Sequence, residues 1–163
     1  MNITKRSEKI PFMGIKNGQT VTYHRLKGFT EFSKSANAKE YSRQYIDEDF
    51  EQSDVVGYSP SISYAFDLDS ANEVHKDLVS IADNELCASA AVRSIVIVDL
   101  STESATSGSY SAVCRDFAVI PDAEGDSTDA YTYSGSMKAK TKVVFGTATT
   151  TDEWQTLTFT AEE

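Results

Sequence analysis

The sequence predicts a mainly β domain with one α-helix packed against it. The β-branched residues Val, Ile and Thr total 37 of the 163 residues, whereas Leu totals 6. Such side chains are favoured in pleated strands and less so in helices. Several segments alternate apolar and polar side chains with a period of two, and one segment carries helix start and stop signals. The length suits a single domain over residues 1–163.

The first third of the chain is expected to contain one strand between two irregular segments. Residues 1–18 predict an extended N-terminal arm, with a turn region from Gly14 to Gly18. Residues 19–30 predict one long strand with a kink. Residues 33–53 are charged and poor in aliphatic side chains, and they predict a long loop. Loops of this length are uncommon inside compact domains and are often functional.

The middle of the chain carries the clearest strand patterns. Residues 61–68 alternate the apolar side chains of Ile62, Tyr64 and Phe66 with small or polar ones, which indicates a strand with one buried face. Residues 92–100 include the run Ile-Val-Ile-Val and are apolar on both faces. We expect this second strand to be central, or to meet another protein surface on one side.

Residues 70–84 are expected to form the helix. Ser70 and Glu73 have the spacing of a capping box, in which each side chain binds a free backbone N–H of the first turn. Asn84 is the expected stop. The predicted apolar face has helical spacing and consists of Ala71, Val74, Leu78, Ile81 and Ala82.

The last third of the chain is expected to hold further strands at 110–120, 130–136, 137–146 and 155–160. Pro121 should end the first of these, because proline cannot donate to a ladder. The alternative for residues 130–146 is one long strand bent at Gly135. The last strand should bury Leu157 and Phe159 on one face.

The charge is unevenly distributed along the chain. The net charge is -10, which argues against tight binding of nucleic acid. Residues 1–45 contain nine Lys and Arg and three Glu, whereas residues 46–163 contain six Lys and Arg and 22 Asp and Glu. This asymmetry is typical of an arm or a partner surface, and two solvated segments that differ by chance are the alternative.

No motif for catalysis, cofactor binding or metal binding is present. There is no glycine-rich phosphate loop and no nucleophile elbow. The acidic residues 47–51 and 122–126 lack the ligand spacing of a calcium loop. Cys87 and Cys114 are expected to be buried free thiols, and His24 and His75 to be surface or boundary residues. We therefore expect neither an enzyme nor a bound cofactor or metal.

Three stretches together carry a resemblance to a known family. They are Lys-Glu-Tyr-Ser-Arg-Gln-Tyr-Ile-Asp-Glu at 39–48, Asp-Val-Val-Gly-Tyr-Ser-Pro-Ser-Ile-Ser-Tyr-Ala-Phe-Asp at 54–67, and Met-Lys-Ala-Lys-Thr-Lys-Val-Val-Phe-Gly-Thr-Ala at 137–148. In these stretches, and in the short helix after the second, the chain resembles the major tail proteins, or tail tube proteins, of long-tailed phages of Gram-positive bacteria. The resemblance covers most of the chain.

The resemblance implies a two-sheet β-sandwich or a partly open barrel with one flanking helix. It further implies a structural virion protein whose copies form stacked, hexameric rings, a tube through which DNA passes during ejection. The implied partners are other copies and other tail proteins, namely the tape measure, the tail terminator and the baseplate. The implied location is the virion tail, assembled in the host cytoplasm, with no membrane partner. An acidic wall would repel passing DNA, so the passage would be transient and non-adhesive.

Residues 1–15 and 33–50 are the expected contacts between subunits, because head-to-tail contacts pair opposite charges. The candidates are Lys5, Arg6, Lys9, Lys34, Lys39, Tyr41, Arg43, Tyr45, Asp47, Glu48 and Asp49. We expect that deleting residues 34–49 leaves a folded domain but abolishes tube growth. The alternative function is a β-sandwich receptor or carbohydrate-binding module of a phage or phage-like particle, which would bind sugar through exposed Tyr and Trp154.

Overall fold

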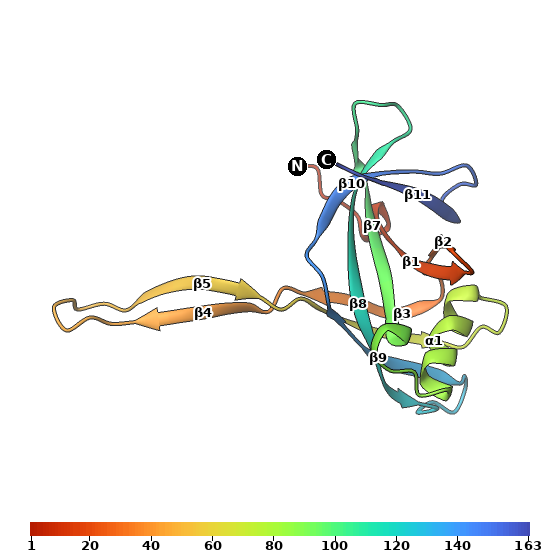
Figure 1. Cartoon of the computed structure of the whole chain (residues 1–163), viewed down its shortest axis with the longest axis horizontal. Coiled ribbons are helices and arrows are strands. Elements are labelled where there is room, and N and C mark those ends of the chain that lie inside the picture. The colour runs from red at the N-terminus through yellow and green to blue at the C-terminus, as the bar shows by residue number, and fades with distance from the viewer.

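The computed structural model describes all 163 residues and shows a β-rich body from which a long hairpin projects (Figure 1). One α-helix, two short 3-10 helices and eleven strands make up the fold. The elements are η1 (Arg6–Glu8), β1 (Lys9–Asn17), β2 (Thr20–Arg25), β3 (Phe29–Ser35), β4 (Ala38–Arg43), β5 (Gln52–Tyr58), β6 (Ser61–Asp67), α1 (Glu73–Asp83), η2 (Ala88–Ala91), β7 (Val92–Glu103), β8 (Tyr110–Glu124), β9 (Thr132–Ala139), β10 (Val144–Thr149) and β11 (Thr156–Ala161).

Nine of the strands form one antiparallel sheet in the order β10-β11-β2-β1-β7-β8-β9-β6-β3. The long strand β8 also pairs with β10, so the sheet curls back on itself through six strands. The curl is incomplete because β11 and β2 share only two register pairs. The remaining strands, β4 and β5, form a separate two-stranded sheet. The expected class, mainly β with one flanking helix, is confirmed as a partly closed sheet that is not a true barrel.

The central strand β7 separates two hydrophobic cores. Ile95 faces a core of 13 buried residues that also includes Phe66 of β6 and Leu78 of α1. Val96 and Val98 face a smaller core of seven buried residues, which lies within the curled part of the sheet. The run that is apolar on both faces therefore occupies a central position, as the sequence predicts.

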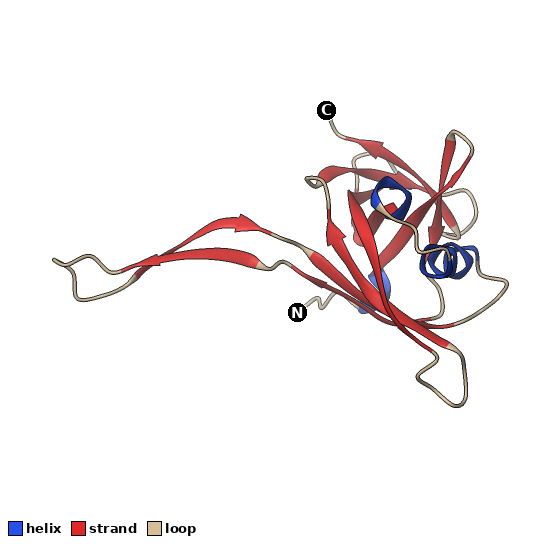
Figure 2. Cartoon of the chain, turned by 60° about the horizontal axis from the view of Figure 1, so that its bottom comes forward, coloured by secondary structure: helices blue, strands red, loops and turns tan.

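Helix α1 covers one face of the sheet, as Figure 2 shows. The expected buried residues Val74, Leu78 and Ile81 are buried, and Asn84 ends the helix. The expected start at Ser70 is wrong: Asn72 is the N-cap, and its side chain accepts hydrogen bonds from the backbone N–H groups of the next turn. None of the helices is long and apolar enough to cross a membrane.

The N-terminal segment differs from the expected extended arm. Residues 9–17 form β1, which lies between β2 and β7 in the large sheet. The reason is that Phe12 and Met13 point to opposite faces of the strand and are both fully buried, one in each core. Only residues 1–8 precede the sheet, and three of them form η1.

Residues 19–30 form two strands in place of one kinked strand. The chain turns after β2 at Gly28, whose φ of +71° suits glycine. Strand β3 then pairs with β6 at the edge of the sheet, far from β2 in strand order.

The long loop expected over residues 33–53 is wrong. Residues 33–35 belong to β3, and residues 38–58 form a β-hairpin built from β4 and β5. We call residues 38–58 the hairpin arm. It continues the β3–β6 pair outward and projects far beyond the body in both views (Figures 1 and 2).

The C-terminal strands also differ in their ends. Strand β8 runs past Pro121 to Glu124, because the proline lies beside a register shift where its missing N–H costs no ladder bond. Strands β9 and β10 are separated at residues 140–143, and Gly135 lies within β9 opposite Tyr64. Among the remaining residues, His75 is fully buried and Cys87 is exposed, both contrary to expectation; Cys114 is half-buried and free.

Candidate interaction surfaces

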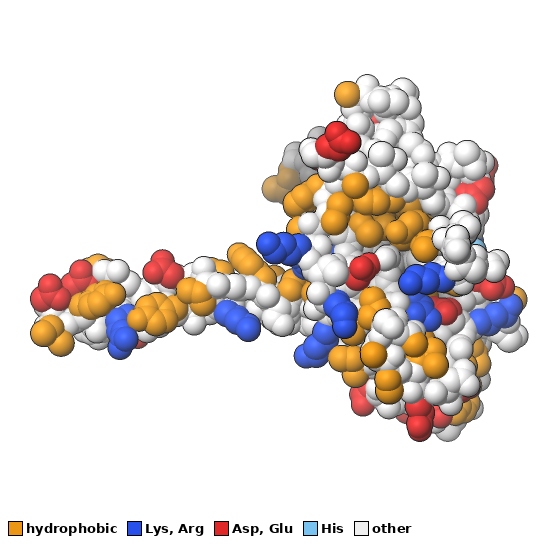
Figure 3. Space-filling model, viewed as in Figure 1, with side chains coloured by type: hydrophobic (Ala, Val, Ile, Leu, Met, Phe, Trp, Pro, Cys, Tyr) orange, Lys and Arg blue, Asp and Glu red, His pale blue; other side chains and the backbone are white.

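The hairpin arm exposes nearly all of its large apolar side chains. Figure 3 shows them as a row of orange groups along the arm. Seven large hydrophobic residues of the arm are each at least 47% exposed: Tyr41, Tyr45, Ile46, Phe50, Val55, Val56 and Tyr58. None belongs to either core. Exposed large apolar side chains gathered on one element are typical of an interaction surface.

One face of the arm carries three of the predicted contact residues. Lys39, Tyr41 and Arg43 alternate along β4 and therefore point to the same side. The Arg43 guanidinium lies 5.8 Å from the centre of the Tyr41 ring, and its Nε donates to the Tyr41 hydroxyl at 3.0 Å. These two side chains are thus held together before any partner binds.

The end of the arm is acidic and apolar. We call residues 45–51 the arm tip; its sequence is Tyr-Ile-Asp-Glu-Asp-Phe-Glu, with four carboxylates and no basic residue. The tip is folded on itself. Glu48 donates its backbone N–H to the Tyr45 carbonyl at 3.1 Å, and its carboxylate accepts from Gln52 Nε2 at 2.6 Å.

A basic groove lies on the body between the N-terminal segment and β3. It comprises two adjoining cavities of about 510 and 220 Å3, which share Arg6, Lys9, Pro11 and Phe32. The basic groove is defined by Arg6, Lys9, Pro11, Arg25, Phe32, Lys34 and Ile97. Its lining holds four Lys and Arg side chains and no carboxylate.

The positive charge of the basic groove is only partly compensated within the chain. Burial, and then the nearby Arg115 guanidinium, lower the pKa of Lys34. The Nε of Arg115 is itself buried without a hydrogen-bond partner. Lys9 is the one cation of the groove whose charge is paired within the chain, because its ammonium lies 3.4 Å from the Asp99 carboxylate. The groove therefore favours an anionic partner.

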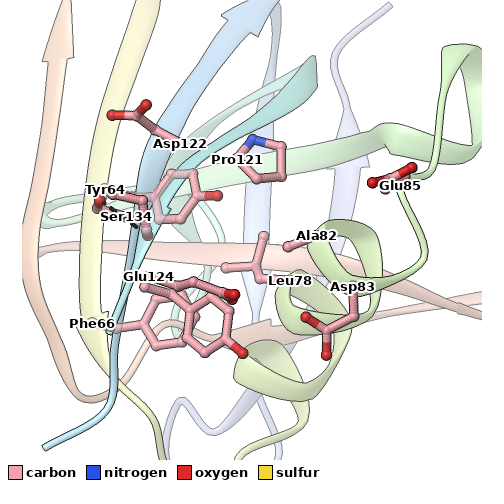
Figure 4. A pocket seen from close by; sticks show the side chains of 12 residues that line it. Tyr64, Phe66, Leu78, Ala82, Asp83, Glu85, Pro121, Asp122, Glu124 and Ser134 are labelled. Carbon is pink, nitrogen blue, oxygen red and sulfur yellow. Dashed lines mark hydrogen bonds between the residues drawn. The ribbon is translucent and has the colours of Figure 1, made fainter. Parts of the chain in front are cut away.

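A third hollow, of about 430 Å3, lies between α1 and strands β6, β8 and β9. Figure 4 shows Leu78 and Ala82 on its helix side and Tyr64 on its sheet side. Four carboxylates surround it: Asp83, Glu85, Asp122 and Glu124. Burial, and then the charge of Asp122, raise the pKa of Tyr64 to about 12.

No group of three or more His, Cys, Asp or Glu side chains in the structure is arranged so that it could hold a metal ion.

The predicted contact residues fall into two groups. Arg6, Lys9 and Lys34 line the basic groove, and Lys5 stands at the start of η1 beside it. The arm carries the other seven: Lys39, Tyr41, Arg43, Tyr45, Asp47, Glu48 and Asp49.

Several residues of these surfaces are not among the predicted contact residues. Val55, Val56 and Tyr58 belong to strand β5 of the arm, and their β-branched and aromatic side chains are typical of a strand. Arg25 and Phe32 join the groove only because β2 and β3 lie near the N-terminal segment in space, which no local pattern shows.

Trp154 does not provide the exposed ring that a sugar site needs. It is half-buried and packs against Phe12 and Tyr110, with ring centres 6.3 and 5.6 Å away. It packs against the smaller core.

The fold is similar to that of chains in two solved assemblies. One is the tail of an empty GTA particle obtained by helical refinement in C6 symmetry, with a TM-score of 0.60 and 13% identity over 88% of this chain and 98% of that chain. The other is the 6-fold symmetrised baseplate of the anti-feeding prophage (AFP), with a TM-score of 0.51 and 8% identity over 89% of this chain and 97% of that chain. No protein-family model and no curated protein match the sequence. At these identities the similarity is one of fold.

Proposed function

We propose that this chain is a structural subunit of a phage-like tail, and that its copies assemble head to tail into stacked six-membered rings. The stacked rings would form the tail tube, a conduit for DNA. The observation that carries the proposal is the hairpin arm, whose seven exposed large apolar residues serve no core of their own chain.

The energetics of the arm favour a partner. Each square ångström of apolar surface removed from water contributes about 25 cal/mol, so the arm leaves substantial stabilisation unused in the free chain. A two-stranded ribbon is only marginally stable in water by itself. Burial against a neighbouring copy would stabilise both the ribbon and the assembly.

The fold and the charge agree with this role. The two similar chains come from a tail solved in C6 symmetry and from a baseplate averaged over six copies. A net charge of -10 would keep DNA from adhering to the wall of a channel. The partners at the tube ends would be the tape measure, tail terminator and baseplate proteins, in a virion tail assembled in the host cytoplasm. The role is structural and needs no enzymatic activity.

Removing the arm without disturbing the body tests the proposal. A deletion of residues 34–49 would cut β3 and leave β5 unpaired. Replacing residues 38–58 by Asn-Gly is cleaner, because the Ser59 N–H already bonds to the Asn37 carbonyl at 3.2 Å and would close a two-residue turn. The side-chain amide of Asn37, which donates to the Ser59 carbonyl and the Ser61 hydroxyl, is kept.

Wild-type protein should form tubes with a central channel in negative-stain electron microscopy, with baseplate proteins added as an initiator where assembly needs one. The arm-less variant should stay monomeric and unfold at nearly the wild-type temperature. Tubes formed by the arm-less variant, or a wild type that never assembles at any concentration or salt with the initiator present, would overturn the proposal.

A further inference from the structure

We propose that the arm tip of one copy docks into the basic groove of a neighbouring copy. Its carboxylates would face Arg6, Arg25 and Lys34, and Ile46 and Phe50 would cover the apolar floor of the groove. This inference rests on the proposed function, since it names the contact through which copies join.

The two surfaces match in charge. The arm tip carries four carboxylates and no base, and the lining of the basic groove carries four cations and no carboxylate. Opposite potentials of this kind steer association and fix the register of a contact.

The two surfaces also match in apolar character. Ile46 is fully exposed and Phe50 is 64% exposed at the tip. In the groove, Pro11, Phe32 and Ile97 line the same cavity as Arg6, Lys9 and Lys34. A contact with an apolar centre and a charged rim is typical of specific protein interfaces.

Both surfaces are organised before they meet. Hydrogen bonds from Gln52 and Gln44 to Glu48, at 2.6 and 3.1 Å, hold the tip in one shape. The groove is built on β1 and β2, which pair with each other, and on β3, which pairs with β6. Little conformational entropy is then lost on docking, which favours affinity.

The groove lacks an anion that the tip can supply. Burial, and then the field of the Arg115 charge, lower the pKa of the Lys34 ammonium group. Carboxylates brought to the groove beside Lys34 would offset the repulsion from Arg115, because the interaction of opposite charges is strengthened where water is excluded.

The tip that fills a groove must come from another copy. The arm points away from the body in both views, so its end cannot reach the groove of its own chain (Figures 1 and 2). Each copy then offers one tip and one groove at different places. Such heterologous contacts close into rings or propagate as tubes.

Charge reversal tests the contact directly. The tip variant is Asp47→Lys with Asp49→Lys, which spares the folded Glu48 turn, and the groove variant is Arg25→Glu with Lys34→Glu. The matched controls, with equal charge changes elsewhere on exposed residues, are Glu162→Lys with Glu163→Lys, and Lys140→Glu with Lys142→Glu. The readout is the critical concentration for tube formation, measured by pelleting.

We expect the tip and groove variants each to raise the critical concentration by about tenfold or more, because two attractive charge contacts become repulsive. The controls should stay within about threefold of wild type. A chain carrying all four substitutions of the tip and groove variants should recover most of the loss. Tip and groove variants that behave like the controls, or a combined chain that recovers nothing, would overturn the contact while leaving tube formation intact.

A second measurement does not depend on tubes. The arm-less variant keeps a groove but no tip, and the groove variant keeps a tip but no functional groove. Mixed together, they should form a 1:1 complex in sedimentation velocity, which neither forms alone. Absence of this complex would overturn the docking, whether or not the wild type builds tubes. Binding of a short single-stranded oligonucleotide by the arm-less variant, lost on Arg25→Glu with Lys34→Glu, would assign the groove to phosphate instead.

Discussion

The body and the hairpin arm treat apolar side chains in opposite ways. Both are antiparallel β-structure, and the β4–β5 and β7–β8 pairings each contain one register shift. In the body, Phe12, Val96 and Met137 are fully shielded from water. In the arm, every large apolar residue is at least 47% exposed.

Buried apolar residues stabilise the fold of the body, whereas the exposed ones of the arm are available for the association that we propose. Residues that alternate against a second layer build a core, and residues that alternate on a ribbon with no second layer remain available to a partner. Substitutions in the cores and on the arm should therefore affect folding and the proposed association separately.

The sharpest test of this separation compares two apolar truncations. Leu78→Ala removes a side chain that is 2% exposed in the larger core, so it should destabilise the protein by about 2–5 kcal/mol. Val56→Ala on the arm should change the stability by less than about 0.5 kcal/mol. Urea unfolding at concentrations where the chain is monomeric measures both. Equal losses would show that the arm also stabilises the body.

Two glycines make the next comparison. In Gly146→Ala the new methyl group would lie 2.2 Å from the Thr160 carbonyl oxygen, so β10 and β11 must move apart, at a cost of about 1–3 kcal/mol. In Gly57→Ala on the arm the nearest atom is the flexible Lys39 side chain at 3.9 Å, and the change should be neutral or slightly stabilising. Thermal unfolding of the two variants distinguishes them, and a harmful Gly57→Ala would contradict the comparison.

The smallest expected effect is a pH dependence that belongs to the body alone. Burial against Phe66 lowers the pKa of His75 below its usual 6.5. The Asp69 N–H donates to Nδ1 at 3.1 Å, so the neutral ring carries its proton on Nε2 and donates it to the Lys27 carbonyl at 2.9 Å.

Because the unfolded chain binds this proton more readily, stability is complete above about pH 6.5 and falls as the pH decreases through 6. The urea midpoint should therefore decrease between pH 7.5 and 5.5, equally in wild type and in the arm-less variant. His75→Phe should be less stable at pH 7.5 but should lose much of this dependence. A midpoint that rises on acidification would refute the assignment.

The sequence predicts the parts of the fold that depend on local periodicity. The strands expected at 61–68 and 92–100 correspond to β6 at 61–67 and to the first nine residues of β7 at 92–103, and the buried face of α1 follows from its 3.6-residue pattern. The observed N-cap, Asn72, lies two residues after the predicted one, Ser70, because both residue types are good caps. Asn72 is favoured by a tertiary contact that the sequence does not show: its side-chain amide donates to the Lys27 carbonyl at 3.1 Å.

The arm and the groove could be predicted only as residue types. The strands of the hairpin arm have no buried face, so their sequence does not alternate apolar and polar side chains. The charged composition of residues 33–53 therefore indicated a loop. Strand β1 has no alternating pattern, because its buried residues lie consecutively and face both sides of the sheet. This short apolar run follows a polar segment and includes Gly14, so the sequence indicated an arm. The groove combines three elements that are apart in sequence, and its shape exists only in the folded chain.

The continuity of the hairpin arm with the sheet has a mechanical consequence. Strands β3 and β6 run directly into β4 and β5, and β6 is joined to β9 by seven register pairs. A pull on the arm along its length loads these hydrogen bonds in shear, so that all of them share the force, whereas a pull across the ribbon would open them one at a time. In the proposed assembly, an arm held by a neighbouring copy could thus carry tension without separating the strands of its own subunit.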